Sequence, residues 1–323
     1  MGAPLTPYGL PSDQYHCLLD EQPYYLTPPS LMRQPELLGP VVVNPDCWFS
    51  WHGPLPPRIA ARVDFTENFL LSDRMVWIED PATLAIWPFW VGDEYFEFLS
   101  RMTPGSPLEE ELPPHVRWVL NEANILVDLD YLGQRRRQWQ QLVSLYAETF
   151  RHGYVVVTDL IHPFHVGALR RYYRHRTRCG FYRLGDEQVG RRFGAHNEMM
   201  ARYIHNQLTH AISDIARNVL KPSYAYFVSY LSGAHLEKHF DREQCDYSIT
   251  TCIDCSPEPE GDAPWPIELD TGSGTARVYQ AVADALLYRG CSIAHSRERL
   301  PNGFTCTSLL LHYVGDSFSG GLD

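Results

Sequence analysis

The sequence contains no long basic run. Its 27 lysines and arginines are scattered among 39 acidic residues, for a formal net charge of -12 at pH 7. Proteins that bind nucleic acid through the phosphate backbone carry a basic patch or stripe, so we expect no nucleic-acid partner. No stretch approaches the roughly 20 apolar residues that a membrane helix needs. Residues 1–14 lack the cationic start and the apolar core of a secretory signal. We therefore expect a soluble, cytoplasmic protein without a membrane partner.

Cysteine is also scarce. Eight cysteines in 323 residues are too few, in too large a chain, for a disulfide scaffold. Cys252 and Cys255 form a C-x-x-C pair, but a zinc ribbon needs a second such pair, and the sequence has none. We interpret the cysteines as buried or free thiols.

Apolar residues are plentiful enough for a folded chain, since 44% of the sequence is hydrophobic and 20% is charged. Proline marks off the beginning, because 12 of the 25 prolines lie in residues 1–60. Each proline removes a backbone donor and prevents a long helix. Residues 1–60 are therefore predicted to form a Pro-rich extended segment that docks onto the rest of the protein through its aromatic side chains.

Residues 61–132 predict a small α/β module. "RMVWIED" and "LAIWPFW" are typical of strands, while "GDEYFEFLSRM" and "PPHVRWVLNEANILV" are typical of helices. Two short strands and two helices fit a winged-helix-like module. Such a module could be a docking surface for a peptide or protein, or only an extension of the scaffold.

Residues 133–323 change character near residue 223. Amphipathic helical segments and the apolar strand "GYVVVTDL" come first. Short alternating runs such as "SYAYFVSYL", "CDYSITTCID" and "SLLLHYV" follow, separated by turn residues. Many short strands with turn signals indicate a β-sandwich or barrel. The predicted fold class is α+β, with a double-stranded β-helix (jelly-roll, cupin-like) catalytic core, flanking helices and the small N-terminal module.

A possible metal site stands out within these strands. His239 and Asp241 are two residues apart at the entrance of one predicted strand, so their side chains point to the same face. His295, just past a later predicted strand, is the best third ligand. Two histidines and one carboxylate leave metal positions open, as in non-haem Fe(II) oxygenases. The alternative is a chance pairing of a surface histidine and aspartate, since the chain has 14 histidines.

Further residues of this region form a recognisable series with the three candidate ligands. The series is Tyr230, Gly233, Leu236, His239, Asp241, "ADALLYRG", His295, Gly303 and "TSLLLHYV". It resembles the prolyl-hydroxylase-like branch of the Fe(II)/2-oxoglutarate dioxygenase superfamily. With the lead-in strand "GYVVVTDL", the resemblance covers residues 150–315. It implies an enzyme that uses Fe(II), 2-oxoglutarate and O2 to hydroxylate an unactivated C–H bond. The substrate would be a peptide or protein side chain, or an amino-acid-like small molecule.

The resemblance also implies roles for single residues. His239, Asp241 and His295 would be the catalytic metal ligands, and Tyr230 would help to hold 2-oxoglutarate. The family has an arginine or lysine about ten residues after the distal histidine, where it binds the far carboxylate of the co-substrate. This chain has Thr305 at that position. A buried carboxylate without a cation would be poorly compensated.

We expect Arg297 to supply the missing cation, because on a continuing strand it would share the face of His295. The hydroxyl groups of Thr305 and Ser308 would add contacts. Two further alternatives stay open: an Fe(II) oxygenase with another co-substrate or none, and a metal-binding cupin-like protein without catalysis. The other candidate cations are Lys238, Arg289 and Arg299.

Overall fold

The computed structural model describes residues 40–63, 74–158, 160–259 and 263–323. Most of the predicted Pro-rich segment, residues 1–39, lies outside these ranges. The predicted three-part division, with boundaries after residues 60 and 132, stays a prediction.

The chain forms two compact units. Of the described residues, the first comprises those up to Leu142 together with Pro163–Tyr172, and the second comprises those within Val143–His162 and Tyr173–Asp323. Helices Leu129–Phe150 (α4) and Pro163–Arg178 (α5) therefore each have residues in both units.

The first unit is built on a three-stranded antiparallel sheet in the order β2-β3-β4. Both predicted strands are present, as Met75–Glu79 (β3) and Ile86–Trp90 (β4), and Cys47–Phe49 (β2) pairs with β3. Pro88 lies within β4, opposite Trp77, where an edge strand tolerates the missing N–H. The other elements are Val41–Val43 (β1), Leu126–Asp128 (β5), Ser50–His52 (3-10), Pro57–Ala60 (α1), Asp93–Leu99 (α2) and Pro114–Glu122 (α3).

The core of the first unit is apolar and includes part of α5. Helix α3 begins at Pro114, since proline suits the first turn of a helix, and it buries Val116 and Leu120. Phe164 and Ala168 of α5 pack into the same core. The winged-helix-like character of residues 61–132 stays a prediction.

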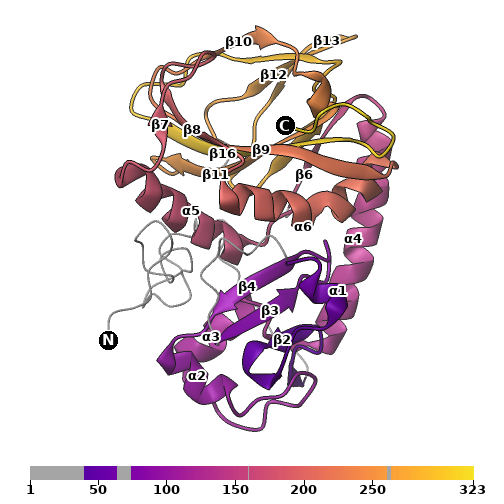
Figure 1. Ribbon diagram of the computed structural model, residues 1–323, viewed down its shortest axis with the longest axis vertical. Coiled ribbons are helices and arrows are strands. Elements are labelled where there is room, and N and C mark those ends of the chain that lie inside the picture. The colour runs from indigo at the N-terminus through magenta and orange to yellow at the C-terminus, as the bar shows by residue number, and fades with distance from the viewer. Residues whose placement is uncertain (1–39, 64–73, 159, 260–262) are drawn as a thin grey trace. The chain divides into compact units, whose positions relative to one another are not determined.

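The second unit contains two antiparallel sheets, drawn as facing layers in Figure 1. The large sheet has the order β6-β14-β11-β16-β9-β8-β7, and the small sheet has the order β10-β15-β12-β13. Strands β9 to β16 supply four strands to each sheet in the arrangement of a jelly roll, as the sequence predicts. The strands are Tyr154–Val157 (β6), Arg183–Leu184 (β7), Arg192–His196 (β8), Leu220–Tyr230 (β9), Leu236–His239 (β10), Tyr247–Ser256 (β11), Ile267–Thr271 (β12), Gly274–Val278 (β13), Ala285–Tyr288 (β14), Ala294–Arg297 (β15) and Thr305–Gly315 (β16).

One helix of the second unit covers the large sheet. Met199–Ala216 (α6) packs against β9 and β16, on the side away from the small sheet (Figure 1). It begins after Glu198, whose carboxylate accepts hydrogen bonds from the backbone N–H groups of Met200 and Ala201. The opposite face of the large sheet is therefore free to form a cavity with the small sheet. A short 3-10 turn, Glu243–Cys245, precedes β11.

Among the described residues, no helix combines the length and the apolar character needed to cross a membrane. Cys252 and Cys255 are both buried, and neither forms a disulfide with another described cysteine.

Candidate functional site

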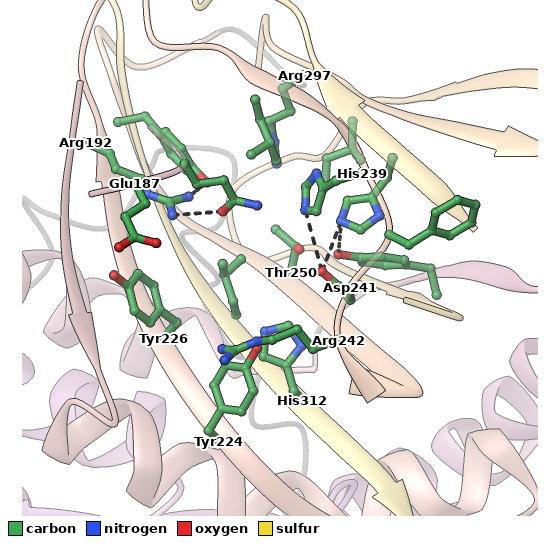
Figure 2. Close-up of a pocket in the computed structure, with 18 residues that line it drawn as sticks. Glu187, Arg192, Tyr224, Tyr226, His239, Asp241, Arg242, Thr250, Arg297 and His312 are labelled. Carbon is green, nitrogen blue, oxygen red and sulfur yellow. Dashed lines mark hydrogen bonds and ion pairs between the residues drawn. The ribbon is translucent and has the colours of Figure 1, made fainter. Parts of the chain in front are cut away.

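A cavity of about 540 Å³ lies between the two sheets of the second unit. Thr250 on β11 and Leu310 on β16 line it from the large sheet, and His239 and His295 line it from the small sheet. Figure 2 shows that polar and charged side chains from many strands point into it. The cavity is thus a product of the jelly roll and not of any one segment.

His239, Asp241 and His295 all line this cavity and lie close together. Figure 2 shows His239 and Asp241 side by side. His239 ends β10 and pairs directly with His295 on β15. One ligand atom from each of the three residues lies within 4.8 Å of the others. Asp241 Oδ1 is 3.7 Å from His239 Nε2 and 3.5 Å from His295 Nε2.

Backbone carbonyls determine which nitrogen of each imidazole is free. His239 Nδ1 lies 2.8 Å from the carbonyl oxygen of Glu237, and His295 Nδ1 lies 3.1 Å from that of Ile293. A carbonyl oxygen only accepts, so each Nδ1 carries the proton and each Nε2 presents a lone pair. Two lone pairs beside a carboxylate repel one another unless a cation lies between them. This donor set fits Fe(II) and other first-row divalent ions.

The electrostatics of these residues favour metal binding. Burial lowers the pKa of His239, so its imidazole is neutral at pH 7. Burial by itself would raise the pKa of Asp241. The proximity of His295 and His312 and the hydrogen bond from the Ser248 hydroxyl outweigh burial and lower this pKa below its usual value. Both side chains thus offer the deprotonated ligand atoms that a metal requires.

Asp241 is held in place by neighbours from two other segments. Ser248 Oγ, on β11, donates to Asp241 Oδ2 at 2.6 Å, which leaves Oδ1 facing the histidines. The backbone N–H of Asp241 donates to the carbonyl oxygen of Gly290 at 3.0 Å. A Cβ at residue 290 would overlap both Asp241 Oδ2 and Ser248 Oγ, so this close approach requires glycine.

Arg297 lies on β15, two residues after His295, and lines the same cavity. Its buried guanidinium donates to the carbonyl oxygen of Trp265 at 2.6 Å and lies 3.5 Å from Gln280 Oε1. Its guanidinium carbon is 4.5 Å from the ring centroid of Trp265. Burial lowers the pKa of Arg297, and no carboxylate of the described ranges pairs with it. A buried guanidinium in this setting favours an anionic ligand.

The remaining predicted co-substrate residues divide into two groups. Tyr230, at the end of β9, lines the cavity, and its hydroxyl accepts a hydrogen bond from Arg192 at 3.2 Å. Thr305 and Ser308 do not line the cavity.

The alternation along β16 explains the position of Thr305. Leu310 and His312 face the cavity, so Thr305, an odd number of residues away, points to the opposite face. Thr305 pairs with Ser256 at the start of β16. Cys306, and not Thr305, shares the inner face of the strand.

The other candidate cations are engaged outside the cavity. Lys238 forms an ion pair with Asp270 at 3.1 Å, and Arg289 forms one with Asp246 at 3.4 Å. Arg299 lies 3.4 Å from a backbone carbonyl oxygen. Arg297 is therefore the candidate that the structure places beside the predicted metal ligands.

The sequence reasoning missed several cavity residues. Tyr288, whose hydroxyl lies 3.3 Å from His295 Nε2, and Thr250 come from strands whose residues are buried on both faces. Because both faces are buried, the sequence of these strands does not indicate which residues face the cavity. His312 could have been found from the sequence, because a histidine is unusual in the apolar run "SLLLHYV". Tyr224 and Tyr226 line the cavity from β9.

No protein-family model matches the chain, and no curated protein matches it. Solved structures are similar to about half of it. A prolyl-4-hydroxylase from Pseudomonas putida has a TM-score of 0.44 and 17% identity, over 54% of this chain and 100% of that chain. The non-haem α-ketoglutarate-dependent epimerase SnoN from nogalamycin biosynthesis has a TM-score of 0.46 and 12% identity, over 55% and 83%. HygX from Streptomyces hygroscopicus, with nickel and 2-oxoglutarate bound, has a TM-score of 0.42 and 13% identity, over 54% and 88%.

Because these TM-scores lie below 0.5, the case for a function rests on the geometry of the cavity itself.

Proposed function

We propose that this chain is a non-haem Fe(II)/2-oxoglutarate-dependent oxygenase of the prolyl-hydroxylase-like branch. It would hydroxylate an unactivated C–H bond of a peptide or protein side chain, or of an amino-acid-like small molecule. One observation carries the proposal. The same cavity holds two imidazoles and a carboxylate with converging ligand atoms, and a buried arginine that no described carboxylate neutralises.

His239 Nε2, His295 Nε2 and Asp241 Oδ1 would hold the iron. When bound, Fe(II) supplies the activation of O2 that oxidation of an unactivated C–H bond requires. Ser248 and Gly290 keep the carboxylate in place, while the two backbone carbonyls accept from the Nδ1–H groups, so that Nε2 of each neutral imidazole is the ligand atom. The ligands are thus oriented before the metal arrives.

Arg297 would bind the far carboxylate of 2-oxoglutarate. Strand residues two apart are separated by about 7 Å, so a five-carbon dicarboxylate can reach from the metal ligands to the guanidinium. The planar guanidinium can donate two parallel hydrogen bonds to a carboxylate. Trp265 shields it from water, which strengthens the attraction between opposite charges.

An anaerobic titration tests this proposal. Fe(II) is added to the metal-free protein, followed by 2-oxoglutarate, and the visible charge-transfer band of the chelate is recorded. We expect a band that His239→Ala abolishes. Arg297→Gln should retain metal binding and weaken 2-oxoglutarate binding by about 10- to 100-fold, because a charge-assisted interaction is lost. Arg299→Gln is the matched control and should leave both affinities unchanged.

Two other outcomes of the titration would contradict parts of this proposal. Iron binding without a band would indicate an oxygenase with another co-substrate, or a cupin-like metal-binding protein. A normal band in Arg297→Gln would show that a different group anchors the co-substrate.

A further inference from the structure

His312 lies at an irregularity of the large sheet and lines the cavity. Leu311 pairs with Ala225, but Tyr313 pairs with Pro222, so the register of β16 with β9 shifts at His312. Such β-bulges are common beside active sites, where they redirect a side chain.

At this bulge, the backbone carbonyl of His312 accepts a hydrogen bond from a side chain. His205 Nε2, on α6, lies 2.7 Å from this oxygen, and Ser223 Oγ lies 2.8 Å from it. Burial lowers the pKa of His205 to about 3, so its ring is neutral and its one N–H donates to the carbonyl. Tyr313 Oη in turn donates to the carbonyl of His205 at 2.9 Å. The carbonyl of His312 is thus held by the buried imidazole of His205. Ser223 is only partly buried, and its hydroxyl lies nearer to the carbonyl oxygen of Gln244, at 2.6 Å.

The imidazole of His312 is held in one tautomer. Ser248 Oγ lies 2.6 Å from Asp241 Oδ2 and 3.3 Å from the carbonyl of Cys245, so its single proton goes to the nearer carboxylate. His312 Nδ1 lies 3.0 Å from Ser248 Oγ and is therefore the donor in that pair. Burial lowers the pKa of His312 to about 4, so the ring is neutral and Nε2 has a lone pair. Among the described residues, Nε2 has no hydrogen-bond partner.

We propose that His312 is a substrate-binding residue whose Nε2 accepts a hydrogen bond from a hydroxyl or N–H group of the substrate. This inference rests on the proposed oxygenase function and narrows its substrate class. The substrate carries a hydrogen-bond donor that lies near the metal ligands, because Ser248 joins His312 to Asp241. Tyr224, whose ring centroid is 4.6 Å from that of His312, forms the adjoining wall. An analogue without the donor would leave Nε2 unpaired and bind more weakly.

Histidine-selective ¹⁵N NMR on the full-length protein tests the tautomer. Spectra are recorded without metal, and with Zn(II) and 2-oxoglutarate as a diamagnetic stand-in, and His312→Phe identifies the resonances. We expect a protonated Nδ1 and an unprotonated Nε2 for His312 in both states. A protonated Nε2 at neutral pH would overturn the proposal. Ser248→Ala, which removes the acceptor of Nδ1–H, is expected to populate both tautomers.

Benzyl alcohol and benzyl methyl ether then test the acceptor, since they differ in one donor group. We expect the alcohol, and not the ether, to shift the His312 Nε2 resonance. His312→Phe should weaken binding of the alcohol by about tenfold and remove its advantage over the ether. Equal shifts from both probes, or no shift from the alcohol, would overturn the proposal. Failure to bind Zn(II) together with a normal response of His312 would instead count against the oxygenase function alone.

Discussion

Asp241 receives little support from its own segment, because it lies just beyond the end of β10. Its position depends on the Ser248 hydroxyl and on the absence of a side chain at Gly290. Both neighbours can be altered without touching a metal ligand. Variants of Ser248 and Gly290 therefore test the orientation of the Asp241 carboxylate while the carboxylate itself is retained.

Ser248→Ala should weaken metal binding by about 10- to 100-fold, because an unrestrained carboxylate loses its orientation toward the histidines. Calorimetric titration with Mn(II) would measure the affinity. Ser229→Ala is the matched control, since Ser229 Oγ is bonded to Thr307 and Ser229 does not line the cavity. Equal affinities for the wild type and Ser248→Ala would show that Ser248 does not position the ligand.

Gly290→Ala should be more severe. The added methyl group would overlap Asp241 Oδ2 and Ser248 Oγ, so we expect loss of metal binding and destabilisation by about 1–3 kcal/mol. Gly272→Ala, where a Cβ meets nothing within 4 Å, should change neither property. Thermal unfolding and the same titration provide the measurement. Tolerance of alanine at residue 290 would mean that the turn can move away from the carboxylate.

At the scale of the element, β16 shows how a one-residue difference changes a site. The resemblance seen in the sequence predicts the cation at the position of Thr305, but successive side chains of a strand point to opposite faces. Cys306 is the buried residue on the inner face, and its Sγ lies 2.9 Å from Cys255 Sγ. A count of residues along the chain cannot distinguish these two positions, whereas the pairing of β16 with its neighbours does.

A rescue experiment tests this alternation. In an Arg297→Gln background, Cys306→Arg should restore part of the 2-oxoglutarate affinity, because its guanidinium would enter the space that Arg297 vacates. Thr305→Arg, on the opposite face, should restore none. The charge-transfer titration measures both variants. Rescue by Thr305→Arg instead would show that the strand turns its other face to the cavity.

At the scale of the whole molecule, α5 contributes to both units, because Pro163–Tyr172 belongs to the first and the following residues belong to the second. Phe164, in the first part of α5, is packed in the core of the first unit. Residues far along the chain thus complete a core that begins with Val43 of β1. A truncation that removes all residues up to Leu142 would also remove the residues against which Phe164 packs.

Phe164→Ala should destabilise the first unit by about 3–5 kcal/mol, the usual cost of removing a buried aromatic ring. The affinity of the second unit for metal should remain at the wild-type value. Thermal unfolding and calorimetry would measure the two properties. Leu129→Ala, at an exposed position, is the control and should shift stability by less than about 0.5 kcal/mol. Loss of metal binding in Phe164→Ala would show that the units do not fold separately.

The sequence by itself determined the relations that are local along a strand. The two-residue spacing from His295 to Arg297 predicts a shared face, and both residues lie within β15. The prediction that His239 and Asp241 lie together at the entrance of one strand is wrong, because β10 ends at His239 and Asp241 follows it outside any strand. The short alternating runs likewise predict the jelly roll that the strand order shows. These inferences needed no knowledge of which strands pair.

Only the tertiary structure decided the relations between strands. Ser248, Gly290 and His312 come from different segments and meet around Asp241 through strand pairing and a tight turn. The register of β16 with β9 shifts at His312, and His205 donates a hydrogen bond to the carbonyl of His312. Neither feature can be predicted from the hydrophobic periodicity of the sequence. The physical reason is that side-chain direction follows from local backbone geometry. Whether two side chains from different strands meet across a cavity depends instead on how all the strands that connect them are paired and in which register.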